Sequence, residues 1–157
     1  MEKAHKEWFD ALYKRNHKRL FIMAKSVLHN SACAEEIVHD VFLICICKIN
    51  DVIAHENPDG WLTRTMKNQL GNELRKAYRA RETSIEEYHN LGGVYKEEPF
   101  EELLPQGLSS QERQLLVWFF QDRLSHEEIS DRLHISTNAC RTRLFRAKAH
   151  CKELLEK

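Results

Sequence analysis

The chain has 157 residues, of which 42% are hydrophobic, and it contains only five glycines and three prolines. This length holds one ordinary domain or two small ones, and the composition predicts a globular, helical protein. Lys and Arg together number 24, as do Asp and Glu, so the net charge is zero. A zero balance excludes a uniformly basic chain, although separate charged patches could still cancel.

The cysteines and histidines give no sign of a disulfide framework or a metal site. Five cysteines are an odd number, and we find no secretory signal, so we expect a reducing, cytoplasmic setting in which they are small buried apolar residues. Neither they nor the nine histidines show CxxC or HxxxH spacing, and we therefore predict no metal and no cofactor. The apolar run 41–47 is too short to cross a membrane, so no membrane insertion is expected.

The first half of the chain has helical periodicity. Apolar residues recur at helical spacing through 8–27, and Asn30 with Ser31 interrupts the run and can cap the next helix. The following segment, AEEIVHDVFLICICKI, is unusually apolar in its second half. We expect this helix either to pack on more than one side or to present a surface to a partner.

A third long helix is predicted after a loop at 55–60, over 61–82. One face carries the apolar stripe, and basic or amide side chains lie opposite. The stripe consists of Leu62, Met66, Leu70, Leu74 and Ala77; the opposite face carries Arg64, Lys67, Asn68, Arg75 and Arg79. Residues 60–82 hold six Lys or Arg against two Glu, so this segment is one basic patch.

From 83 to 107 the periodicity fades. Gly92 with Gly93, Pro99 and Pro105 are typical of a linker, and residues 83–102 carry six glutamates against one lysine. We therefore expect a flexible acidic linker over 83–107.

The C-terminal segment 108–157 predicts three further helices. Ser109 with Glu112, and Ser125 with Glu128, have the spacing of capping boxes, and Ser136 is a good N-cap for the last helix. Apolar residues Leu115, Leu116, Phe119 and Phe120 are expected to supply the core of the first of these helices.

The last helix combines an apolar stripe with a strongly basic surface. Cys140, Leu144, Ala147 and Cys151 recur at spacings of four, three and four. Between 136 and 152 there are five Lys or Arg and no acidic residue, whereas an ordinary solvated face usually mixes both signs. Two short helices joined by a tight turn, the second of them basic, predict a DNA-binding helix-turn-helix.

These segments together resemble the extracytoplasmic-function (ECF) group of bacterial sigma factors. The stretch from LSSQERQLLVWFF to RLFRAKAHCKEL is similar to the family's C-terminal promoter-reading domain. AEEIVHDVFL resembles its core-polymerase-binding helix, and NPDGWLTRTMKNQLGNELRK resembles the helix that opens DNA and reads the downstream element. The resemblance implies an all-α fold with a region 2-like domain at 1–82, the linker at 83–107 and a region 4-like helix-turn-helix domain at 108–157.

The resemblance also implies three sets of binding residues. The upstream, minus-thirty-five element would be read by Asn138, Arg141, Thr142, Phe145 and Arg146. The downstream, minus-ten element would be bound by Arg64, Lys67, Asn68 and Arg75. Polymerase would be contacted by Ile37, His39, Asp40, Val41, Phe42 and Ile44. His39 with Asp40 replaces the family's usual amide-acid pair. Ile44 and Cys47 stand where the family usually carries charge, so these two residues are either buried or part of a more apolar docking face. Trp61 is expected to pack into the core rather than to stack on a base.

The implied function is that of a transcription initiation factor without enzymatic activity. Its expected partners are core RNA polymerase and promoter DNA, and an anti-sigma factor is left open as a third partner. The alternative is a stand-alone helix-turn-helix regulator that uses 108–157. A metal-dependent nuclease is a third reading, for which Glu35 and Glu36 with His39 are the nearest approach to a site; a solvated helix start explains them more simply.

Overall fold

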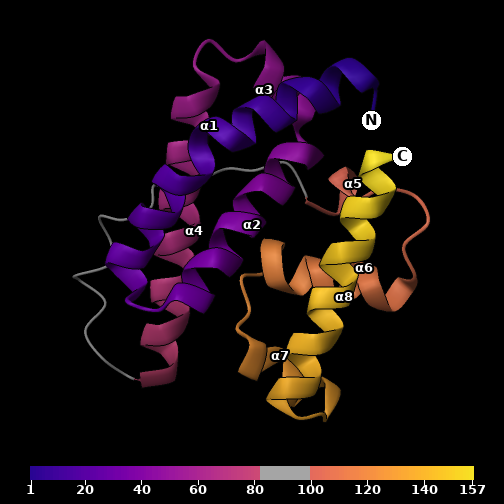
Figure 1. The fold of residues 1–157 in the computed structure, drawn as a ribbon. Helices are drawn as coiled ribbons and strands as arrows, with labels where there is room; N and C mark the ends of the chain where they lie inside the picture. The colour runs from indigo at the N-terminus through magenta and orange to yellow at the C-terminus, as the bar shows by residue number, and fades with distance from the viewer. Residues whose placement is uncertain (82–99) are drawn as a thin grey trace. The chain divides into compact units, whose positions relative to one another are not determined.

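A computed structural model describes residues 1–81 and 100–157, with side chains described through 77 and again from 100 (Figure 1). All regular elements in these two ranges are helices, which confirms the predicted all-α class. The chain divides into two compact units, Met1–Val94 and Tyr95–Lys157. The acidic part of the predicted linker, 83–99, lies outside the described residues. No helix within the described ranges is both long enough and apolar enough to cross a bilayer.

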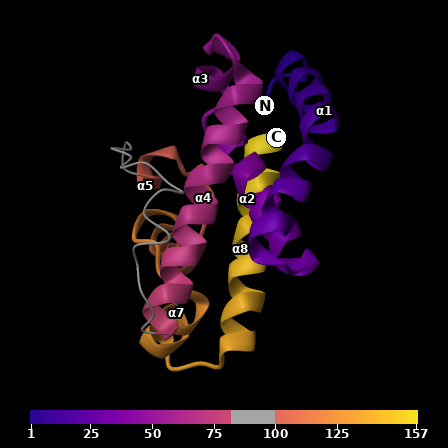
Figure 2. The same cartoon turned by 90° about the vertical axis from the view of Figure 1, so that its left-hand side faces the viewer.

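The first unit is built on three long helices that pack side by side (Figures 1 and 2). They are α1 (Lys3–Leu28), α2 (Ser31–Cys47) and α4 (Pro58–Arg81), with the short α3 (Ile49–Ala54) between the last two. The core between them is apolar, and its fully buried members include Leu12, Leu20, Val38, Val41, Leu62, Met66 and Leu70. The predicted stripe of α4 is therefore buried in its first three positions.

A two-residue break separates α1 from α2. His29 ends α1 in the left-handed region, with φ 55°, and Asn30 caps α2 by accepting a hydrogen bond of 3.0 Å from the Cys33 amide. This confirms the predicted cap. All residues from Leu43 to Ile46 are buried, so the apolar second half of α2 packs on more than one side.

Helix α4 begins three residues earlier than the sequence predicted. Pro58 occupies the first helical position, where its missing N–H and fixed φ cost nothing. Asn57 Oδ1 accepts a 3.0 Å hydrogen bond from the Gly60 amide and so acts as the cap. A Cβ at Gly60 would lie 2.5 Å from Asn57 Nδ2, so any larger residue there would require the capping side chain to move. The predicted loop at 55–60 is thus wrong for its last three residues, because Asn-Pro-Asp-Gly here starts a helix.

The second unit contains the helix-turn-helix. Its elements are α5 (Phe100–Leu103), α6 (Ser110–Leu116), the π-helical turn η1 (Val117–Gln121), α7 (His126–Leu133) and α8 (Thr137–Glu156). Both predicted capping boxes are confirmed, at Ser109 with Glu112 and at Ser125 with Glu128. Ser136 caps α8 by accepting from the Ala139 amide at 3.1 Å.

The second unit takes in residues that the sequence assigned to the linker. Phe100 is buried and its ring lies 5.0 Å from that of Phe120, while Arg113 donates a 2.6 Å hydrogen bond to the Pro105 carbonyl. Residues 100–107 therefore belong to this unit, and its start differs from the expected boundary at 108. Helix α5 has only four residues, too few for a repeating apolar pattern to predict it from the sequence.

The π turn η1 was not predicted. It interrupts the helix that starts at Ser110 and places Phe119 and Phe120 side by side, with ring centroids 5.0 Å apart and planes at 86°. Both rings are buried, as expected for core residues. A widened turn is rare and lets two consecutive large side chains reach the same core.

The turn of the helix-turn-helix is closed by local hydrogen bonds. His134 ends α7 in the left-handed region, with φ 55° and ψ 45°, and the Ile135 amide donates to the Ser130 carbonyl at 3.1 Å. Ser130 is buried, and its hydroxyl donates to the Glu127 carbonyl at 2.8 Å. A serine at this position is therefore satisfied within its own helix.

The cysteines only partly follow the expected pattern. Cys45, Cys140 and Cys151 are buried, and burial raises the pKa of Cys45 to about 12, so that it remains protonated at neutral pH. Cys47 is half-buried. Cys33, in the first turn of α2, is exposed, and for this residue the prediction of a buried cysteine is wrong.

Candidate nucleic-acid and polymerase interfaces

The residues predicted to read the upstream element form one exposed face of α8. Asn138, Arg141, Thr142, Phe145 and Arg146 follow one another at spacings of three, one, three and one, which brings them onto the same side of a helix. All five side chains are exposed, and Phe145 is 72% exposed despite being a large apolar residue. The Phe145 ring therefore stands in solvent between the exposed side chains of Arg141 and Arg146.

The opposite side of α8 anchors the helix in its unit. Cys140, Leu144, Ala147 and Cys151 are all buried, which confirms the predicted stripe. The His150 ring nitrogen Nδ1 lies 2.7 Å from Glu112 Oε2, linking α8 to α6. Because one side of α8 is held in the core, the helix cannot rotate, and the same side chains always face the solvent on its other side.

The exposed face of α8 carries arginine side chains. Among the residues that the structure describes, none forms a salt bridge with Arg141, Arg143 or Arg146. The Lys148 ammonium lies over the Phe119 ring, 4.2 Å from its centroid. Lys148 therefore has a packing contact within its own unit.

A similar face runs along α4. Arg64, Lys67, Asn68 and Arg75 have spacings of three, one and seven, which again places them on one side, opposite the buried stripe. Arg64 and Lys67 are exposed, whereas Asn68 and Arg75 are half-buried, and Arg75 donates a 3.0 Å hydrogen bond to Asn72 Oδ1. The side chain of Arg79 lies outside the described residues. Trp61 is half-buried at the start of the helix.

A polar network that the sequence did not predict fixes the start of α4 against α1. Asp59 accepts hydrogen bonds from Arg15 Nε at 2.9 Å and from the buried Asn16 at 2.6 Å. Arg19 donates to Asn16 Oδ1 and to the Thr63 hydroxyl, both at 2.7 Å. The Arg15 guanidinium, and then Asn16, hold the pKa of Asp59 below its ordinary value. The sequence shows an acidic residue, Asp59, near the start of a helix, but it could not predict the partners Arg15 and Asn16, which lie more than 40 residues away.

The predicted polymerase-binding residues are divided by burial. His39 is exposed, whereas Ile37, Asp40, Val41, Phe42 and Ile44 are all buried. The Phe42 ring lies 4.7 Å from Tyr13 and 5.9 Å from Phe9, so it joins α2 to α1. Of this set, His39 is the side chain that offers a polar group at the surface. Ile44 is buried, which was one of the two alternatives that the sequence left open for it. Cys47 is half-buried.

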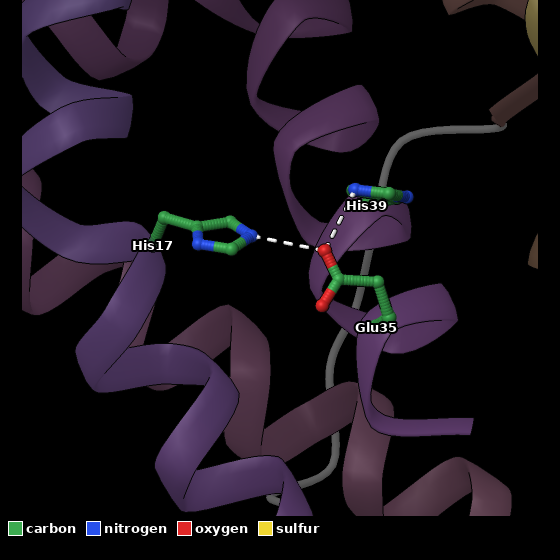
Figure 3. Close-up of side chains that lie close together, drawn as sticks. All are labelled: His17, Glu35 and His39. Atoms are coloured by element: carbon green, nitrogen blue, oxygen red, sulfur yellow. Dashed lines mark hydrogen bonds and ion pairs between the residues drawn. The ribbon is translucent and has the colours of Figure 1, made fainter. Parts of the chain in front are cut away.

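His39 belongs to a cluster of polar side chains that was not predicted from the sequence. His17 Nε2 of α1 and His39 Nε2 both approach Glu35 Oε1, at 3.1 Å and 3.3 Å (Figure 3). Glu35 and His39 are four residues apart on one helix, a spacing that the sequence showed, but His17 comes from another helix. Within the described residues, these three side chains form a group with donor atoms suited to a metal ion.

Comparison with known families places the chain in a class. Residues 12–80 match the family described as Sigma-70 region 2, and residues 102–151 match Sigma-70, region 4. No curated protein matched the chain in sequence. The two matches lie in the family's order and span both helical units, and the form of region 4 is the one typical of the ECF group. The chain therefore belongs to the sigma-70-like sigma factors of ECF type, proteins of promoter recognition and transcription initiation.

Proposed function

We propose that this sigma factor binds core RNA polymerase through its first unit and directs it to promoters by reading two elements, the minus-thirty-five element with α8 and the minus-ten element with α4. The domain roles are those expected from the sequence, 1–82 for region 2 and 108–157 for region 4, with 100–107 added to the second. The partners are core polymerase and promoter DNA, the setting is the cytoplasm, and no enzymatic step is involved. An anti-sigma factor is the third partner that the sequence leaves open.

The observation that carries the proposal is the exposed face of α8. Arginine side chains such as Arg141 and Arg146 can bond bidentately to guanine in the major groove, and the ring of Phe145 can pack on a thymine methyl. The Thr142 hydroxyl donates to the Asn138 carbonyl at 3.0 Å, which leaves its oxygen to accept from a base or its methyl to contact one. Asn138, in the first turn, lies at the positive end of the helix, where a phosphate is favoured.

The face of α4 supports a role at melted DNA. Taking a base out of the stack costs a few kcal/mol, so its pocket must supply hydrogen bonds to the base edge, and the amide of Asn68 can supply them. Arg64, Lys67 and Arg75 flank it on the same face and would hold the strand's phosphates. The Asp59 network keeps the start of this helix in place against α1.

For polymerase binding, the burial pattern favours different roles within the predicted set. His39 would contact polymerase directly. Phe42, with Ile37, Val41 and Ile44, would hold α2 in position. Asp40 would affect polymerase binding indirectly, from its buried position on α2. This assigns docking to the exposed surface of α2 around His39.

Run-off transcription with sigma-free bacterial core polymerase tests the proposal. The protein is added to core polymerase and a pool of promoter fragments, and transcripts are sequenced. Initiation that depends on the protein, from fragments sharing two spaced elements, is the expected result. No initiation, together with tight binding of the protein alone to duplex DNA, would instead support the stand-alone helix-turn-helix regulator.

A further inference from the structure

We propose that His17, Glu35 and His39 form a binding site for a divalent transition-metal ion, with Zn²⁺ as the best match. The three side chains come from two helices of the first unit and converge without taking part in either DNA-binding face (Figure 3). The inference concerns this cluster alone and holds whether or not the protein docks polymerase as proposed.

The donor set is of a kind that binds metals. Two imidazoles and one carboxylate, with a water in the fourth position, is a common set for Zn²⁺ and for other first-row divalent ions. Mg²⁺ and Ca²⁺ prefer oxygen ligands, so the two histidines select against them. Glu35 and His39, four residues apart on α2, lie on one helix face, and His17 faces them from α1.

The distances suit a small tetrahedral ion. Bonds of about 2.0–2.1 Å to Zn²⁺ put neighbouring ligand atoms about 3.3 Å apart. The two imidazole nitrogens lie 3.1 Å and 3.3 Å from Glu35 Oε1, and all three ligand atoms lie within 4.8 Å of one another. The two Nε2 atoms are thus no more than 4.8 Å apart. The His39 side chain is 58% exposed and can rotate to bring them together.

The His17 ring is oriented by its neighbours. It lies 4.9 Å from the Tyr13 ring, and Tyr13 in turn packs on buried Phe42. A ligand held by packing loses less conformational entropy on binding than an exposed one. On binding, the proton on each Nε2 moves to Nδ1 or, if Nδ1 already carries one, is released to solvent, so that each histidine binds the ion through its Nε2 lone pair. The Glu35 carboxylate exchanges its hydrogen bonds from the imidazoles for a bond to the ion.

Titration of the metal-free full-length protein with Zn²⁺ and Co²⁺ tests the site, in a Cys33→Ser background that removes the exposed thiol of α2. Calorimetry should give one ion per chain, and Co²⁺ should give the visible absorption of a tetrahedral nitrogen and oxygen site, without a thiolate charge-transfer band. His17→Ala and Glu35→Gln should each weaken binding about tenfold or more, since even the loss of a group supporting a ligand costs about 10- to 100-fold.

The matched control is His5→Ala, which removes a histidine of the same helix away from the cluster. It should bind Zn²⁺ as the parent does. Zinc should also raise the melting temperature of the parent and of this control, but not of His17→Ala. Equal zinc affinity in the parent and His17→Ala, or a thiolate band with Co²⁺, would overturn the proposal.

An occupied site would also affect docking, a consequence that rests on the proposed function. Once His39 Nε2 is bound to the ion it is not available to polymerase, so Zn²⁺ should weaken core polymerase binding several-fold in the parent and leave His17→Ala unaffected. Equal binding with and without Zn²⁺ would refute this link. Absence of polymerase binding in both conditions would refute the proposed function, while the titration would still decide the metal site.

Discussion

At the scale of single residues, the exposed arginines of α8 separate recognition from stability. Arg146→Ala should weaken binding to the preferred minus-thirty-five element by about 1–3 kcal/mol, because a bidentate contact to a base is lost. The unfolding free energy should stay the same, since Arg146 is exposed and no described residue forms a salt bridge with it. Competition binding with single-base variants of the element, next to denaturant unfolding, measures both.

Arg143→Ala is the matched control for this prediction. Arg143 is exposed on the same helix and, by the rotation of about 100° per residue, lies at the edge of the reading face, roughly 160° around the helix from Phe145. It should alter affinity for all sequences alike. If Arg143→Ala changes base preference as much as Arg146→Ala, the assigned reading face is wrong.

Asp59 gives a pH-dependent prediction, also at the residue scale. Its pKa is lowered in the folded protein by Arg15 and then Asn16, so its contribution to stability is fully present above the unfolded value of about 4 and is lost as the pH falls through the folded value. Because the side chain is 42% exposed, we expect Asp59→Asn to cost only about 0.5–1 kcal/mol at pH 7.

Denaturant unfolding of the parent and Asp59→Asn at a series of pH values measures this effect. The difference between the two proteins should be constant from pH 7 to about pH 5 and should shrink toward zero at about pH 2. A difference that does not depend on pH would show that the carboxylate charge is not what stabilises the start of α4.

At the scale of elements, the turn between α7 and α8 carries local strain. His134 has φ 55°, a conformation that glycine adopts without steric cost. His134→Gly should therefore stabilise the second unit by about 0.5–1 kcal/mol. Ala149→Gly, at an exposed position inside α8, should have the opposite effect and cost about 1 kcal/mol. Thermal unfolding distinguishes the two; destabilisation by both would mean that the His134 side chain has a role of its own.

The helix pair α1 and α2 shows why burial changes the choice of experiment. Phe42 is part of the aromatic cluster with Phe9 and Tyr13, so Phe42→Ala would open a cavity and cost about 3–5 kcal/mol. Loss of polymerase binding in that variant would then report unfolding. His39, which is exposed, gives the cleaner variant for the docking surface.

At the scale of the whole molecule, the two units should have separable tasks. In the presence of a chelator, His39→Ala should reduce affinity for core polymerase while promoter preference is kept, and Arg146→Ala should do the reverse. Fluorescence anisotropy with labelled protein measures the first property, and run-off transcription from promoters with altered elements measures the second. If both variants lose the same property, the proposed division between the two units is wrong.

Much of each helix, and the family, follow from the sequence alone. Both capping boxes, the caps at Asn30 and Ser136, and the two faces of α8 depend on residues within four positions of one another, so helical periodicity is enough to predict them. Helical spacing also puts Asn138 and Phe145, seven residues apart, on one face.

Only the tertiary structure decided which helices meet and in what register. The bonds from Arg15 and Asn16 to Asp59, the approach of His17 to Glu35, and the packing of Phe100 on Phe120 join residues 18 to 44 positions apart. The sequence specifies each helix's own faces, but the partner of a face depends on how neighbouring helices rotate and slide as their side chains interlock. Burial of Asp40 and exposure of His39, adjacent in the sequence, are set by that packing.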